Sequence, residues 1–164
     1  MPSTVPIIYA PRFTESRLTL PGRLFSLGIS VGCLTLLVLA AYLTPNPHGT
    51  GTHAGLSFLH LKPCNFLYTT GIPCPSCGMT TSFSHYVRGH FLASLYLQPM
   101  GFVLALLCSV GFWVGAYETL TARPAHRIFR QIPYNYWLIP LLGFALAAWA
   151  WKIFIHTQGL DGWS

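Results

Sequence analysis

The stretch Leu24–Leu43, with the sequence LFSLGISVGCLTLLVLAAYL, contains 20 consecutive residues and no charged side chain. A transmembrane helix needs roughly 20 apolar residues to cross the ~30 Å hydrocarbon core of a bilayer. A cleaved signal peptide has a shorter apolar core, of ~7–15 residues, after a short basic start. The polar segment that precedes this core, Met1–Arg23, is also long. We therefore interpret Leu24–Leu43 as a transmembrane helix that acts as an uncleaved signal-anchor.

Two further apolar stretches, Pro99–Leu120 and Tyr136–Ile155, are long enough to cross a bilayer. Only 7% of the 164 residues are charged, whereas soluble domains carry about 25%. The expected fold class is therefore an all-α membrane protein with three transmembrane helices. Glu118 falls in the last turn of the second helix, and we expect its carboxylate to reach headgroup water or to pair with Arg123.

Two pairs of glycines, each spaced four residues apart, lie in the first two expected helices: Gly28 with Gly32, and Gly111 with Gly115. This spacing allows two membrane helices to approach closely, although glycine is also generally common in membrane helices. Both interpretations stay open for each pair.

Polar segments join the expected helices: an N-terminal tail (1–23), a long loop (44–98), a basic loop (121–135) and a C-terminal tail (156–164). Lys and Arg are enriched on the cytoplasmic side of membrane proteins. The N-terminal tail and the basic loop, which lie on the same side of the membrane, hold Arg12, Arg17, Arg23, Arg123, Arg127 and Arg130. The segments on the opposite side of the membrane hold only Lys62, Arg88 and Lys152. We therefore expect a cytoplasmic N-terminus and an extracytoplasmic loop 44–98. The basic residues flank apolar runs, which indicates contact with the lipid bilayer and not with nucleic acid.

The long loop contains the string Gly71–Gly78, GIPCPSCG. Pro75 suits the first position of a helix, with Cys74 as its N-cap, and Gly89 suits the left-handed position after a helix end. The expected helix is amphipathic and lies on the membrane surface or against the spans. Its apolar face comprises Met79, Phe83, Tyr86 and Val87. The opposite, polar face comprises Cys77, Thr81, Ser84 and Arg88. Residues 90–97 form a second short helix that leads into Pro99.

Three cysteines in this loop, Cys64, Cys74 and Cys77, are the candidate site residues. Thiolates at a helix N-terminus are stabilised and reactive, and two such sulfurs also suit zinc, with His53 or His60 as a possible fourth ligand. The alternatives are a structural disulfide or zinc staple, a redox-active pair with Cys64 as third partner, and a metal-handling or regulatory site. Paired-carboxylate catalysis is close to excluded, because the only acids are Glu15, Glu118 and Asp161.

The cysteine string resembles a family of bacterial integral membrane proteins, domain of unknown function 2752 (DUF2752). The matching residues are Cys64, Thr70–Thr80, Arg88-Gly89 and Gln98-Pro99, within residues 63–104. Gln98 stands where the family usually has asparagine. Thr81 stands where the family often has arginine, which weakens any role that needs a fixed cation beside the thiols. His90 stands where the family often has aspartate, so the next helix has lost an acidic cap. The resemblance implies a protein of the bacterial inner (cytoplasmic) membrane with a cysteine segment between spans, and it implies no reaction.

Two functional hypotheses follow. In the first, the protein is not an enzyme: the cysteine loop is stapled by a disulfide or by zinc, and the chain is a subunit or assembly partner of other membrane proteins. In the second, the protein is a membrane thiol–disulfide oxidoreductase that uses Cys74, Cys77 and Cys64. The sequence favours the first.

Overall fold

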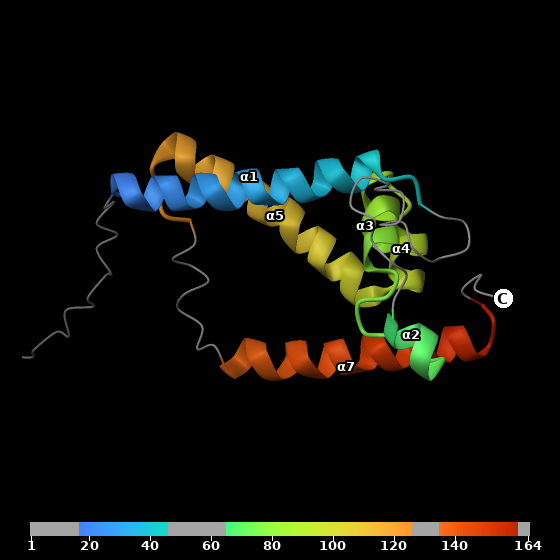
Figure 1. The fold of residues 1–164 in the computed structure, drawn as a ribbon. Coiled ribbons are helices and arrows are strands. Elements are labelled where there is room, and N and C mark those ends of the chain that lie inside the picture. Colours follow the sequence, from blue (N-terminus) through green and yellow to red (C-terminus); the bar gives the residue numbers. More distant parts are fainter. Residues whose placement is uncertain (1–16, 46–64, 126–134, 161–164) are drawn as a thin grey trace, which may run out of the picture.

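The computed structural model describes residues 17–45, 65–125 and 135–160, and all regular structure in these ranges is helical. There are three long helices, α1 (Leu20–Tyr42), α5 (Pro99–Thr121) and α7 (Asn135–Thr157); α1 and α7 run in roughly the same direction, and α5 runs obliquely to them (Figure 1). Three short helices gather at one end of them, α2 (Asn65–Thr70), α3 (Met79–Val87) and α4 (Phe91–Leu97).

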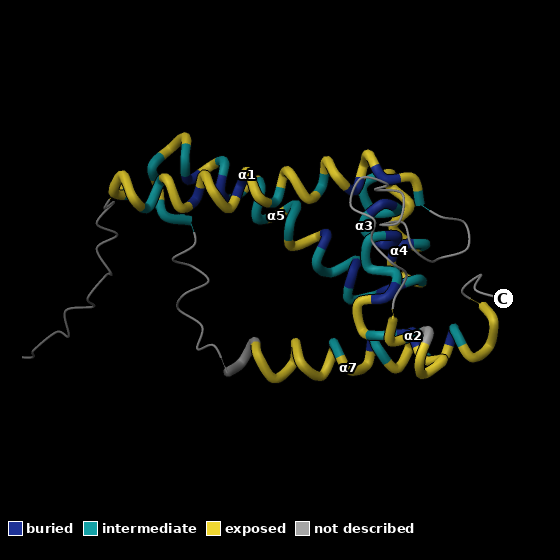
Figure 2. The backbone as a smooth tube through the Cα atoms, in the orientation of Figure 1, coloured by how far each residue is buried: buried dark blue, intermediate teal, exposed yellow. Residues whose placement is uncertain are grey.

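The three long helices are long and apolar enough to cross a membrane. Each has 23 residues, which at 1.5 Å per residue gives about 34 Å, enough for the hydrocarbon core. Most described residues of α1 and α7 are exposed along the whole helix, and α5 also exposes large apolar side chains such as Leu107, Trp113 and Leu120 (Figure 2). Large apolar side chains on that surface need hydrocarbon as solvent, so the expected membrane protein with three spanning helices is confirmed.

α1 and α5 form a closely packed antiparallel pair. At one end the backbone N–H of Leu18 donates to the carbonyl of Ala122 over 2.8 Å, and further along Ser30 Oγ donates to the carbonyl of Phe112 over 3.1 Å. A Cβ atom on Gly115 would lie 2.7 Å from the backbone oxygen of Ser26. The absent side chain is therefore what lets the two backbones approach.

Of the two glycine pairs, only the one on α5 is used in this packing. A Cβ on Gly111 would lie 3.2 Å from Cys33 Sγ, whereas one on Gly28 or Gly32 would meet nothing within 4 Å among the described residues. The close-approach interpretation is therefore confirmed for Gly111 and Gly115, while Gly28 and Gly32 lie on an exposed face of α1.

α3 and α4 form a helical hairpin that packs on the end of the α1–α5 pair. Gly89, at φ +79°, makes the turn between them, as its expected left-handed position required. Ser82 Oγ donates to the carbonyl of Ser94 over 3.0 Å, and Ser94 Oγ donates back to the carbonyl of Ser82 over 2.8 Å. These reciprocal bonds satisfy polar groups that are fully buried and fix the two helices against each other.

The same hairpin caps the C-terminal end of α1. Ser84 Oγ donates to the carbonyls of Ala40 and Leu43 over 2.9 and 3.0 Å. The guanidinium of Arg88 donates to the carbonyls of Ala40 and Ala41 over 3.3 and 3.0 Å. The last carbonyls of a helix have no partner within the helix, so these side chains supply the partners that α1 lacks.

α7 contacts the rest of the protein mainly through its C-terminal half. Trp151 Nε1 donates to the carbonyl of Tyr96 in α4 over 2.8 Å, and the two rings pack edge to face with centroids 5.9 Å apart. Ala148, Lys152 and Ile155, spaced four and three residues apart, are buried, which identifies the face of α7 that packs inward.

Candidate functional site

The cysteine string forms a tight turn that ends before α3 begins. The N–H of Cys77 bonds to the carbonyl of Cys74 over 3.0 Å, which makes residues 74–77 a β-turn with Pro75 at its second position, where proline is favoured. The helix starts only at Met79, with Gly78 as N-cap at φ +83°.

The expected helix start at Pro75, with Cys74 as N-cap, is therefore wrong. Proline suits both the first position of a helix and the second position of a β-turn, so Pro75 alone could not distinguish them. The left-handed backbone conformation of Gly78 separates the β-turn from the helix, so the helical conformation cannot extend back to the cysteines. Since the cysteines precede that interruption, the argument that a helix N-terminus stabilises their thiolates does not apply to this geometry.

The turn brings the two thiols together. Cys74 Sγ lies 3.0 Å from Cys77 Sγ and 3.2 Å from Ser76 Oγ. A disulfide bond measures about 2.05 Å, so this is a dithiol whose sulfurs are already adjacent. Cys77 is 7% exposed, whereas Cys74 is only half-buried. The two sulfurs therefore differ in their access to a reagent or partner.

Two side chains from the spanning helices hold the turn by its backbone. Gln98, fully buried at the start of α5, donates from Nε2 to the carbonyl of Pro75 over 2.6 Å. Trp149 of α7 donates from Nε1 to the carbonyl of Pro73 over 3.0 Å. The turn is thus fastened on both sides of Cys74 by residues far away in the sequence.

These two holding residues were not identified as site residues from the sequence. Trp149 and Trp151 read as an interfacial aromatic belt, but their indoles donate to the turn and to α4. Gln98 was noticeable only as part of the Gln98-Pro99 pair, where the family usually has Asn-Pro. Nothing in the spacing of these residues marks them as neighbours of the thiols.

The remaining sequence-predicted ligands, Cys64, His53 and His60, lie outside the described residues. Within the described ranges no three His, Cys, Asp or Glu side chains gather as metal ligands. The sulfurs of Cys74 and Cys77, 3.0 Å apart, are closer than the ~3.7 Å expected between two thiolates on one tetrahedral zinc. The zinc staple stays a prediction.

His85 lies on α3 beside His90, with ring centroids 5.9 Å apart. Its Nδ1 atom is buried and has no hydrogen-bond partner among the described residues. Burial lowers the pKa of His85, and the nearby charges of His90 and Arg88 lower it further. The imidazole is consequently favoured in its neutral form.

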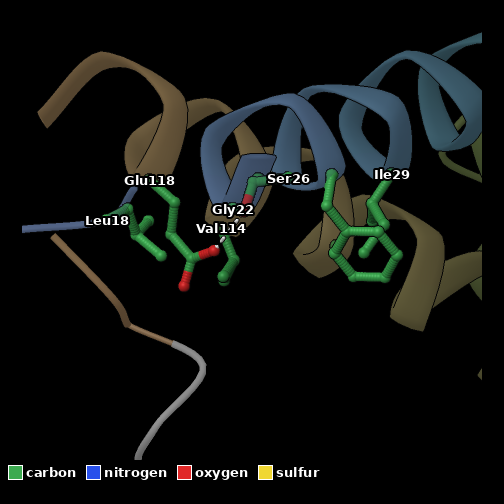
Figure 3. Close-up of a pocket in the computed structure, with 9 residues that line it drawn as sticks. Leu18, Gly22, Ser26, Ile29, Val114 and Glu118 are labelled. Carbon is green, nitrogen blue, oxygen red and sulfur yellow. Dashed lines mark hydrogen bonds between the residues drawn. The ribbon is translucent and has the colours of Figure 1, made fainter. Parts of the chain in front are cut away.

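Glu118 also departs from expectation. It is 3% exposed, and its Oε2 accepts a hydrogen bond from Ser26 Oγ of α1 over 2.6 Å (Figure 3). The expectation that this carboxylate reaches headgroup water is therefore wrong, because the close α1–α5 packing at Gly115 encloses it. The alternative expectation, a pair with Arg123, stays a prediction.

Residues 64–112 match the sequence profile of the family described as protein of unknown function (DUF2752). This part of the chain is similar to the DUF2752 family. The DUF2752 segment, residues 64–112, contains α2, the cysteine turn, α3, α4 and more than half of α5. Of the two side chains that hold the turn, Gln98 lies in this segment and Trp149 of α7 lies outside it. No curated protein and no solved structure matches the chain significantly.

Proposed function

We propose that this chain is a non-enzymatic subunit or assembly partner of a membrane complex, with the DUF2752 segment as a platform stapled at Cys74 and Cys77. The observation that carries the proposal is the 3.0 Å separation of the two sulfurs in a turn held by Gln98 and Trp149. A disulfide across these four residues would stabilise the turn by about 2 kcal/mol in the chain-entropy account.

Exposed apolar side chains before the turn and at the far end of α3 support a docking role. Ile72 is 42% exposed, and Phe91 and Leu92 at the start of α4 are 51% and 84% exposed. Aromatic and aliphatic side chains that gather at the end of a small membrane protein suit contact with another membrane protein. The fixed turn presents Ile72, and the fixed α3–α4 hairpin presents Phe91 and Leu92, with little loss of conformational entropy on association.

The test is the oxidation state of the dithiol in protein purified under air. Alkylation followed by intact-mass analysis should label one pair of cysteines only after reduction, and Cys74→Ser should abolish that difference. Cys33→Ser, in α1, is the matched control and should retain it. If Cys74 and Cys77 are both alkylated without reduction, and metal analysis finds no zinc, the staple does not exist.

The second candidate is a membrane thiol–disulfide oxidoreductase, favoured by the unequal exposure of the two sulfurs. Half-buried Cys74 would attack a partner disulfide as thiolate, forming a mixed disulfide and releasing one partner thiolate. Buried Cys77 would then attack Cys74 Sγ, releasing the second partner thiolate. The chain would lose two electrons and two protons, and the partner disulfide would be reduced to a dithiol.

Trapping of a mixed disulfide with a partner protein distinguishes the oxidoreductase from the structural staple. Cys77→Ser should accumulate a mixed disulfide through Cys74, while Cys74→Ser should accumulate far less, because Cys77 is only 7% exposed. Equal trapping by both variants, or none by either, would contradict the assignment of Cys74 as the attacking thiol.

A further inference from the structure

Gln98 connects α4 to α5, and its backbone is fixed on both sides. Its N–H donates to the carbonyl of Ser94 in α4 over 3.2 Å, and its carbonyl accepts from the N–H of Phe102 in α5 over 3.1 Å. The same carbonyl accepts a second hydrogen bond, from Ser82 Oγ of α3, over 3.1 Å. Three helices therefore fix the point from which the Gln98 side chain extends.

The amide of this side chain ends between the two cysteines. Its Nε2 donates over 2.6 Å to the carbonyl of Pro75, which belongs to the central peptide group of the turn from Cys74 to Cys77. Pro75 and Ser76 are exposed, so packing does little to hold this part of the turn. The hydrogen bond from Gln98 thus fixes the turn at its centre, where the two sulfurs lie 3.0 Å apart.

The acceptor half of the same amide is left unsatisfied. Gln98 is 0% exposed, and its Oε1 has no hydrogen-bond partner among the described residues. A buried acceptor without a partner costs at least as much as a typical hydrogen bond contributes. The loss at Oε1 offsets the gain at Nε2, so Gln98 contributes little net stability to the fold. Its effect on the geometry of the turn remains.

We propose that Gln98 is a positioning residue that sets the reduction potential of the Cys74–Cys77 pair, an inference that rests on the proposed staple. In oxidation by glutathione disulfide, the two thiols lose two electrons and two protons, a bond forms between Cys74 and Cys77, and glutathione disulfide becomes two glutathione thiols. A high effective concentration of one thiol at the other favours this reaction. The disulfide closes the turn by itself, so the bond from Gln98 acts mainly on the dithiol, in which it keeps the sulfurs adjacent.

The experiment measures the thiol–disulfide equilibrium of the full chain in nanodiscs, in buffers of reduced and oxidised glutathione. Alkylation followed by peptide mass analysis gives the oxidised fraction of Cys74 and Cys77. Gln98→Met keeps the length of the side chain and removes the amide. We expect its equilibrium constant for disulfide formation to fall about fivefold, the effect of one lost hydrogen bond, which corresponds to a potential about 20 mV higher. The unfolding midpoint in denaturant should change little, because the unsatisfied acceptor disappears with the donor.

Two further variants complete the test. Gln158→Met, at an exposed position just after α7, makes the same chemical change away from the turn and should leave the equilibrium constant unchanged. Gln98→Asn keeps the amide but shortens the side chain by one methylene, so it should lower the constant as Gln98→Met does, and it decides the result if the methionine variant does not fold.

One outcome overturns this inference alone: the wild type forms the disulfide, and the folded Gln98 variants form it with the same equilibrium constant. A fall in the constant for Gln158→Met as large as that for Gln98→Met would overturn it as well. If instead the wild type forms no Cys74–Cys77 disulfide at any glutathione ratio, the proposed staple fails and this inference fails with it.

Discussion

The two ends of the α1–α5 pair are held together by different chemistry. At the end where α1 begins, two backbones meet across Gly115, and charged side chains, Arg23 and Glu118, bond across the contact. At the end where α1 finishes, the hydroxyl of Ser84 and the guanidinium of Arg88, both from the α3–α4 hairpin, donate to backbone carbonyls. Long helices satisfy most of their own backbone, so close packing suffices there. The last carbonyls of α1, however, have no partner within the helix, and side chains of the short helix α3 satisfy them.

The largest expected effect is at the glycine contact. Gly115→Leu places a side chain where a Cβ alone would lie 2.7 Å from a backbone oxygen, which must separate α1 from α5. We expect a loss of about 3 kcal/mol in the free energy of unfolding in detergent micelles.

Gly28→Leu is the matched control for this substitution. It makes the same chemical change on the neighbouring helix, where a Cβ would meet nothing within 4 Å of the described chain. Equal destabilisation by the two variants would show that helix approach at Gly115 does not hold the pair together.

A smaller loss is expected at the other end. Arg88→Gln removes guanidinium bonds to the carbonyls of Ala40 and Ala41, and Ser84→Ala removes a hydroxyl shared by Ala40 and Leu43. We expect about 1.5–3 kcal/mol for the arginine and about 1 kcal/mol for the serine. The double variant should lose less than the sum of the two, since both side chains bond to Ala40. Strict additivity would mean that they do not act on the same helix end.

A substitution that loosens the cysteine turn should change the reactivity of its thiols more than the free energy of unfolding of the protein. Trp149→Phe removes the indole bond to the carbonyl of Pro73, next to Cys74. We expect alkylation of Cys77 in the reduced protein to accelerate severalfold, with a cost in unfolding free energy of about 1 kcal/mol. Trp151→Phe deletes an equivalent bond to Tyr96 outside the turn and should leave the alkylation rate unchanged. If both substitutions accelerate the alkylation of Cys77 equally, the acceleration reflects a general loosening of α7 and not the bond to Pro73.

The sequence predicted those features that depend on composition and short spacing. Uninterrupted apolar length predicted the three spans, and Gly89 and Pro99 marked the end of α3 and the start of α5. The sequence did not predict contacts between distant elements. Glu118 of α5 is buried against α1, and Trp149 of α7 bonds to the cysteine turn. In both cases the two partners are more than 70 residues apart in the sequence. A polar residue at a span end has the same local signature whether it faces water or a neighbouring helix.

The smallest expected effect is a pH dependence at the hydroxyl-rich end. Burial, with the charges of His90 and Arg88, lowers the pKa of His85 below its ordinary value of 6.5, so the unfolded chain binds that proton more tightly than the folded chain. Stability linked to His85 is therefore present above about pH 6.5 and decreases as the pH falls below it. His85→Gln should flatten the unfolding free energy between pH 7 and pH 5, and His90→Gln should flatten it only partly, since desolvation remains. An unchanged pH slope in His85→Gln would assign the acid sensitivity to another group.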